Sequence, residues 1–213
     1  MHPSARPQWR PAWWVLLLGL AAIVLFGTAF AVRLSCVLGH CAVPSVRYLL
    51  DLDAVGGLPR LFTTGVFVAV AALAGRACRS ATGRARPWWA AVAAAGLALA
   101  VVKLASAHSL AEAGTSPLTT LLLGLAVAVP SLWLLAVAGR AWDVPATVPV
   151  VAALAGYALA ALGLDVLTHL AGLLAGGAGA ASATFVEELG EALAAVAVLA
   201  VVRSGTSAAR PGR

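Results

Sequence analysis

The stretch ATFVEELGEALAAVAVLAVVR, residues 183–203, joins an acidic first half to a second half with no polar side chain before Arg203. The second half is apolar enough to lie in lipid, whereas Glu187, Glu188 and Glu191 fall within five residues of one another. In a helix they occupy one arc of about 100° and therefore face one direction. A charge at the centre of a membrane helix costs about 2.5–3.5 kcal/mol. We therefore expect these carboxylates to face a bundle interior and to be partnered, protonated or close to a helix end.

The composition of the whole chain fits the same environment. Of its 213 residues 62% are hydrophobic and 10% are charged, and the mean hydropathy is +0.97. A soluble domain carries about a quarter charged residues. The apolar runs are close to the length of about 20 residues that a helix needs to cross a bilayer, and backbone in lipid must satisfy its own hydrogen bonds. The sequence predicts an all-α, multi-pass integral membrane bundle.

Six membrane-spanning helices are predicted, at 13–32, 61–75, 88–106, 118–138, 148–167 and 184–202. They form one domain, 13–203, between short basic tails at 1–12 and 204–213. The first run also has the small-x-small ending of a signal peptide at Ala29 to Ala31. Because this run continues to Val32, we favour a retained helix; cleavage would leave five spans.

Arginine sets the expected orientation. If the N-terminus lies inside, the inner segments hold most of the basic residues, namely Arg6, Arg10, Arg76, Arg79, Arg84, Arg86, Arg140, Arg203, Arg210 and Arg213. The positive-inside rule then predicts that both termini are cytoplasmic. One Lys against thirteen Arg and the lack of Asn are typical of a GC-rich genome, so we expect a bacterial inner membrane. The Trp13–Trp14 and Trp88–Trp89 pairs are predicted to anchor helix ends at the membrane interface.

The net charge of +6 does not indicate nucleic-acid binding, because the basic residues sit at the ends of apolar runs and do not line one face. The expected partner is the lipid bilayer, with anionic lipid at the basic inner loop Arg76–Arg86. No pattern in the sequence specifies a protein partner.

Cys36 and Cys41 lie in the first outer segment, CVLGHC, where the environment permits a disulfide. A Cys36–Cys41 disulfide, two plain thiols and a soft metal site with His40 all remain open. Cys78 lies on the reducing side and is expected to be a free thiol.

The acidic end of the last span has a structural interpretation. TFVE fits a capping box, with Thr184 as the N-cap and Glu187 three residues later, after a glycine-rich connection at 176–179. Glu188 would then lie where the positive helix end favours an anion. Glu191 is too deep for this explanation.

Other ionisable residues are predicted to reach the same depth. Lys103 lies in the third span with His108 just beyond it, and Asp165 and His169 lie four residues apart at the end of the fifth. Intramembrane charges are usually paired and often mark ion, proton or substrate paths. We therefore predict an outward-facing ligand or ion site, and its candidate residues are Lys103, His108, Asp165, His169, Glu187, Glu188 and Glu191.

The chemistry of that cluster leaves several functions open. Asp165, His169, Glu187 and Glu191 could hold a divalent metal, but the ammonium of Lys103 would compete for the carboxylates. A coupled, proton-linked network fits better, so a metal cofactor is not favoured. The leading prediction is a non-enzymatic membrane component that binds or conducts a cation or a proton-linked solute. The alternatives are an outer-leaflet membrane enzyme, for which a metal-dependent reaction is one option, and a structural subunit in which the cluster only orients helices.

The chain has no HExxH, P-loop or GxSxG motif. No catalytic residue can therefore be assigned. The outer segment 47–59 is predicted to form a short amphipathic piece over the cluster.

Overall fold

The computed structural model describes residues 13–52, 54–105 and 117–208, except for the side chains of a few residues near the middle of the last helix and at its end. Within these residues the chain is helical and contains no strand. The helices are α1 (Trp13–Val37), α2 (Pro44–Leu49), α3 (Leu58–Ser80), α4 (Ala85–Leu104), α6 (Pro117–Ala141) and α7 (Thr147–Ala208). Five stretches are long and apolar enough to cross a membrane: Trp13–Val37, Leu58–Ser80, Ala85–Leu104, Leu118–Ala141 and Thr147–Leu164. The predicted all-α class is confirmed.

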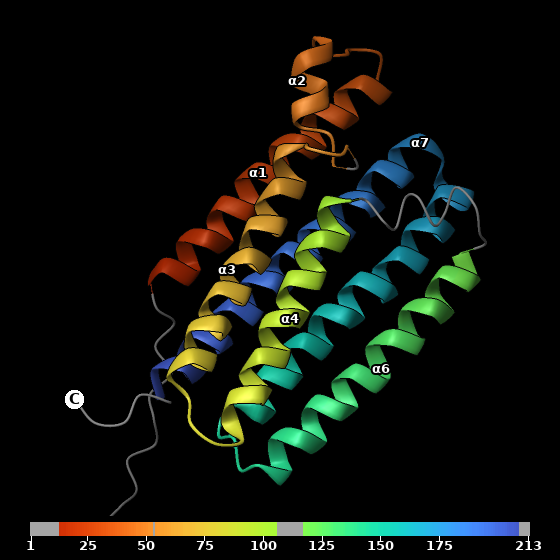
Figure 1. Cartoon of the computed structure of the whole chain (residues 1–213). Helices are drawn as coiled ribbons and strands as arrows, with labels where there is room; N and C mark the ends of the chain where they lie inside the picture. Colours follow the sequence, from red (N-terminus) through yellow and green to blue (C-terminus); the bar gives the residue numbers. More distant parts are fainter. Residues whose placement is uncertain (1–12, 53, 106–116, 209–213) are drawn as a thin grey trace, which may run out of the picture.

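The long helices pack as antiparallel rods (Figure 1). The start of α1, the α3–α4 and α6–α7 connections and the end of α7 all lie at one end of the bundle, which we call the lower end (Figure 1). The α1–α2 connection and the start of α3 lie at the upper end. The described part of the chain therefore begins and ends on the same side.

Helix α3 is longer than the sequence suggested, since it covers 23 residues where the apolar run covered 61–75. Gly57 is its extended N-cap, and Pro59 occupies the first turn, where a missing N–H costs nothing. Thr63 and Thr64 lie within it and are buried. The Thr63 hydroxyl donates a 3.4 Å hydrogen bond to the carbonyl oxygen of Pro59, one turn earlier in the same helix.

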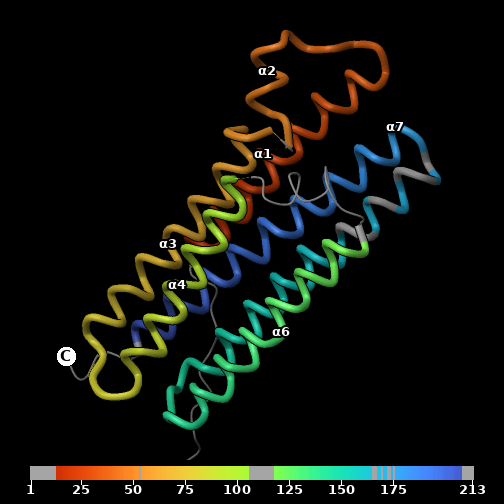
Figure 2. The backbone as a smooth tube through the Cα atoms, turned by 45° about the vertical axis from the view of Figure 1, so that its right-hand side comes forward, coloured from red at the N-terminus to blue at the C-terminus, as the bar shows by residue number. Residues whose placement is uncertain are grey.

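The last helix folds back on itself. Helix α7 runs for 62 residues and contains one non-helical residue, Gly176, with φ 64° and ψ −162°. It thus has two arms, 147–175 and 177–208, that run in opposite directions from this elbow (Figure 2). The predicted glycine-rich connection at 176–179 is therefore wrong in extent. A positive φ is accessible to glycine without strain, so a single residue makes the reversal.

The second arm of α7 lies at the centre of the bundle, and α7 as a whole contacts α1, α3 and α6. Ala195, Val198 and Val202 of this arm are almost fully buried. They share one core with Phe67 of α3 and Val150 of the first arm. Spacings of three and four residues place the buried positions of the second arm on one helix face.

The predicted interfacial role of Trp88 and Trp89 is wrong. Both are 1% exposed and pack edge to face with their ring centroids 4.9 Å apart. The Trp88 indole N–H donates a 3.0 Å hydrogen bond to the carbonyl oxygen of Leu135 in α6. The pair therefore fills the lower end of the bundle, where a buried indole finds the partner it requires.

At the upper end the chain turns sharply after α1. Cys36 and Cys41 are joined as a disulfide with their Cα atoms 4.0 Å apart, and Gly39 between them has φ 92°. The chain then forms α2 and returns to the bundle through Leu52, which is fully buried beside Phe26 and Ala192. The segment predicted to cover the cluster therefore places the Leu52 side chain beside Ala192, the residue that follows Glu191 in the sequence.

Thiol labelling tests the disulfide. The chain has three cysteines, and Cys78 is the free one. Denatured, unreduced protein is expected to take up one maleimide label per chain, and reduced protein three, as read by intact mass. A Cys78→Ser control is expected to take up none before reduction. Three labels without reduction would contradict the pairing.

The lower end allows a test of helix packing. A Cβ at Gly139 of α6 would collide with the Thr147 side chain and lie 2.6 Å from Trp88 Nε1. Overpacking costs about 1–3 kcal/mol, so Gly139→Val is expected to lower the melting temperature in detergent. At Gly19 an added Cβ meets nothing within 4 Å. Gly19→Ala is therefore the control, and equal melting of both variants would contradict this packing.

Candidate functional site

The three carboxylates of the second arm continue the buried stripe of that helix. Glu187, Glu188 and Glu191 are 8%, 7% and 3% exposed. They precede Ala195 and Val198 on the same face, at the spacing of successive turns. The acidic residues therefore occupy core positions of the central helix, not a solvated helix end.

Lys103 of α4 meets two of these carboxylates. Its ammonium forms a close ion pair with Glu191 Oε2 and lies 3.6 Å from Glu188 Oε2. The Lys103 side chain is 14% exposed, and those of Glu188 and Glu191 are 9% and 4% exposed. Water screens a pair this deeply buried much less than it screens a surface pair.

Two hydroxyl groups from the first arm of α7 complete the described contacts. The Tyr157 hydroxyl donates a 3.3 Å hydrogen bond to Glu191 Oε2, and the Thr168 hydroxyl donates a 2.6 Å bond to Glu187 Oε2. The Tyr157 ring also packs edge to face on Phe67 of α3, with centroids 4.7 Å apart. The cluster therefore combines side chains from α4 and from both arms of α7.

Arg60 adds a second cation to the surroundings of the cluster. It is 5% exposed in the first turn of α3, and its charge acts on Lys103. One turn further, the Thr64 hydroxyl is buried without a hydrogen-bond partner among the described residues. Helix α3 thus presents polar groups on one face.

The predicted capping box is wrong. Thr184 lies inside α7, and its hydroxyl donates a 3.0 Å hydrogen bond to the carbonyl oxygen of Ala180. Glu187 uses its carboxylate for Thr168 of the other arm. The helix starts again directly after Gly176, so Thr184 has no free helix end to cap.

Not all predicted site residues can be placed. Lys103, Glu188 and Glu191 come together, and Glu187 is held beside them by the same helix. His108 lies outside the described residues. Asp165 and His169 lie in the first arm of α7, but their side chains lie outside the described part of the structure.

The predicted metal set needs those two side chains. Among the residues that the structure describes, no group of three or more His, Cys, Asp and Glu side chains could hold a metal ion. Glu191, a member of that set, is engaged by Lys103 and Tyr157. A divalent ion bound to Glu191 Oε2 would compete with the lysine for that oxygen.

Tyr157 and Thr168 were missed in the sequence, although a signal was present. They lie 11 residues apart, which is close to three full turns and places them on one helix face. Two hydroxyl residues repeated at this spacing in an apolar span indicate a face turned toward polar partners. Arg60 offered no comparable signal, because it stands beside Pro59 at the edge of an apolar run.

Lys103 faces more than one carboxylate. Its single ammonium contacts Glu191 and Glu188 together, and Glu187 lies on the same face of the second arm. A net charge buried among apolar helices is costly. Carboxylates that share one cation at this distance bind protons as a coupled set.

The structure thus defines an all-helical protein with membrane-length helices and a buried acid–base cluster between three helical segments. No protein-family model, curated protein or solved structure matches the chain.

Removal of Lys103 tests the ion pair. Loss of one partner of a buried pair costs about 3–5 kcal/mol, so Lys103→Met is expected to melt well below the wild type at neutral pH. The loss is expected to shrink in acid, because protonated Glu188 and Glu191 no longer need the cation. Thermal melts of the full chain in detergent would measure both effects.

The exposed Arg84 provides the matched control, since Arg84→Met removes a cation at the lower end and is expected to cost less than about 0.5 kcal/mol. Lys103→Met protein as stable as the wild type at neutral pH would contradict the pairing.

Proposed function

We propose that the chain is a bacterial inner-membrane protein with six spans and both termini in the cytoplasm. Five stretches have the length and apolarity of spans. The second arm of α7, which holds the predicted span 184–202, runs antiparallel to the first (Figure 2). Arg76, Arg79 and Arg203 belong to the lower end, whereas the Cys36–Cys41 disulfide lies at the upper end. Positive-inside topology and an oxidising exterior favour the same orientation.

We further propose that the cluster of Lys103, Glu187, Glu188 and Glu191 is an outward-facing site that binds one proton, in exchange for a monovalent cation or together with a solute. The observation that carries this proposal is the contact of one buried ammonium, that of Lys103, with the two carboxylates of Glu191 and Glu188. Groups this close titrate as a set. The proton therefore belongs to the cluster and not to one assigned residue.

The occupancy of Glu191 favours this function over metal-dependent chemistry. Lys103 and Tyr157 both contact Glu191 Oε2, and a divalent ion would compete with a tethered ammonium for the same oxygen. A non-enzymatic role fits these groups better than a reaction at the outer leaflet.

A purely structural role is the competing explanation. The same contacts tie α4 to the second arm of α7 and tie the two arms to each other. Neither of the two described cavities is lined by a residue of the cluster. A purely structural cluster and a proton-binding site differ in whether the carboxylates ever bind a proton. This difference can be measured.

Infrared spectroscopy of the full chain in lipid vesicles tests this difference. A protonated-carboxyl band is expected to grow between mildly alkaline and acidic buffer. Glu188→Gln leaves Glu191 as the one carboxylate in contact with Lys103 and is expected to reduce the band. Lys103→Met removes the cation that both carboxylates contact and is expected to enlarge it. The responses are opposite because the first change removes a carboxylate and the second removes the cation.

Asp143→Asn is the matched control, since Asp143 is exposed at the lower end and has a φ of 50° that asparagine tolerates. It is expected to leave the band of the cluster unchanged. If the wild type shows no such band, or if Glu188→Gln and Lys103→Met show equal bands, the purely structural role is the explanation.

A further inference from the structure

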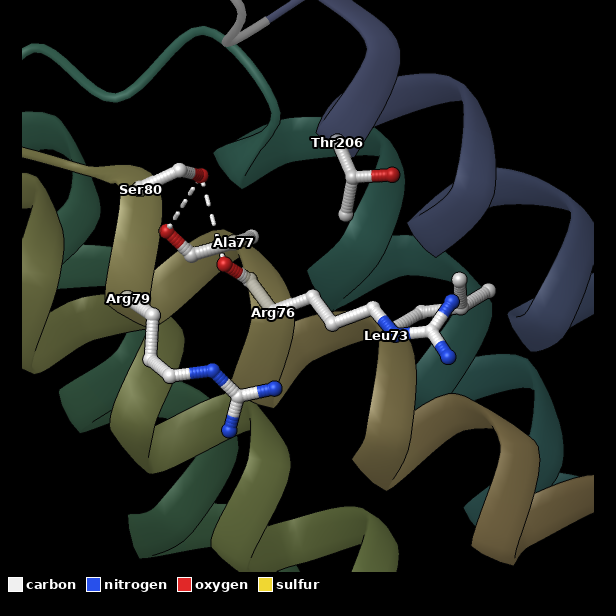
Figure 3. Close-up of a pocket in the computed structure, with 6 residues that line it drawn as sticks. All are labelled: Leu73, Arg76, Ala77, Arg79, Ser80 and Thr206. Carbon is white, nitrogen blue, oxygen red and sulfur yellow. Dashed lines mark hydrogen bonds between the residues drawn. The ribbon is translucent and has the colours of Figure 1, made fainter.

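A second polar site lies at the opposite end of the bundle. The last two turns of α3 and the last turn of α7 enclose a cavity of about 380 Å³, lined by Leu73, Arg76, Ala77, Arg79, Ser80 and Thr206 (Figure 3). We call it the basic pocket. Arg76 extends toward Leu73 and the side of Thr206, and Arg79 extends away from them (Figure 3).

The lining of the basic pocket carries positive charge and holds no acidic residue that would balance it. Neither Arg76 nor Arg79 forms a salt bridge within the described part of the chain, and no acidic residue lines the pocket. Arg203 at the same end is already engaged over the Trp14 ring, 4.6 Å from its centroid. Two guanidinium groups are therefore available to an anion.

The hydroxyl groups of the pocket already donate to backbone carbonyl oxygens, so the arginines are the groups that can bind an anion. Ser80 donates to the carbonyl oxygens of Arg76 and Ala77, both at 3.2 Å. Thr206 donates to the carbonyl oxygen of Arg203 at 2.8 Å. With these donors used locally, a ligand must present oxygens to guanidinium, and phosphate oxygens suit that fork geometry.

The position and apolar part of the pocket favour a lipid over a free anion. Helix α3 is about 34 Å long, close to the thickness of the hydrocarbon core, so its last turn lies at headgroup depth when the helix spans a bilayer. Leu73 and Ala77 give the pocket an apolar wall. Because the two arginines extend in different directions, an extended headgroup reaches both better than a compact ion does.

We propose that the basic pocket binds the phosphate headgroup of an acidic phospholipid. This site makes specific the anionic-lipid contact expected for the inner loop, and it is separate from the carboxylate cluster. Arg76 and Arg79 hold the headgroup, and Leu73 contacts the glycerol or the first part of an acyl chain.

Native mass spectrometry of the full chain in detergent tests the site, with phosphatidylglycerol, phosphatidylcholine and inorganic phosphate as separate probes. The wild type is expected to retain phosphatidylglycerol at least tenfold better than phosphatidylcholine and to show no saturable binding of inorganic phosphate. The double variant Arg76→Gln/Arg79→Gln is expected to lose that preference.

The proposal narrows the lipid contact expected for the loop Arg76–Arg86 to Arg76 and Arg79, because Arg84 and Arg86 do not line the pocket. The matched control is therefore Arg84→Gln/Arg86→Gln, which removes the same charge from exposed residues of that loop. It is expected to bind phosphatidylglycerol within twofold of the wild type. Equal loss in both double variants would show general charge attraction and overturn the site. Saturable binding of inorganic phosphate would overturn the assignment to a lipid. Absence of lipid discrimination in the wild type would overturn the proposal even if the variants failed to fold.

Discussion

The burial of three carboxylates on the interior face of the central helix is the constraint on which the upper half of the bundle depends. Glu188 and Glu191 occupy the positions that Ala195 and Val198 occupy two turns further on, and Glu187 is buried beside them. A carboxylate in such a position needs a counter-charge, hydrogen bonds or a proton. Lys103 must therefore face the second arm of α7, and this requirement orients α4.

The cluster also depends on the elbow at Gly176. Thr168 and Glu187 are 19 residues apart in the chain but share a 2.6 Å hydrogen bond because α7 reverses between them. Tyr157 reaches Glu191 across the same two arms. A loop of several residues would leave the two arms free to shift along each other, whereas a reversal at one glycine fixes which turns face one another.

The sequence determined much of this architecture in advance. Helical class, the course of the long helices and the inward direction of the acidic arc follow from apolar run length and from the spacing of Glu187, Glu188 and Glu191. The predictions that were wrong concern features that depend on contacts with neighbouring helices. Trp88 was expected at the membrane interface, but its ring is buried and its indole N–H donates a hydrogen bond to the carbonyl oxygen of Leu135. Thr184 was expected to cap a helix that in fact begins at the elbow.

The cluster itself was predictable only in part, for a related reason. Lys103 and the three glutamates stand out because charge is rare in apolar spans. Tyr157 and Thr168 are amphipathic residues that any span tolerates, so only their spacing of about three turns indicated a polar face. Which carboxylate Lys103 meets depends on the rotation of α4 about its axis, and one sequence does not specify that rotation.

The two halves of the bundle differ in how they are held together, and this difference bears on the proposed proton site. The lower half is closed by Trp88, Trp89 and the close approach of Gly139 to Thr147. These contacts are apolar or neutral and do not change with protonation. The upper half is joined by the Lys103 ion pairs and by hydroxyl–carboxylate bonds. On the proposed function, binding of a proton weakens the attraction between α4 and the second arm of α7 only above the packed tryptophans. Movement linked to proton binding would then be confined to the upper end, which is the outer end in the proposed topology, while the lower end stays closed.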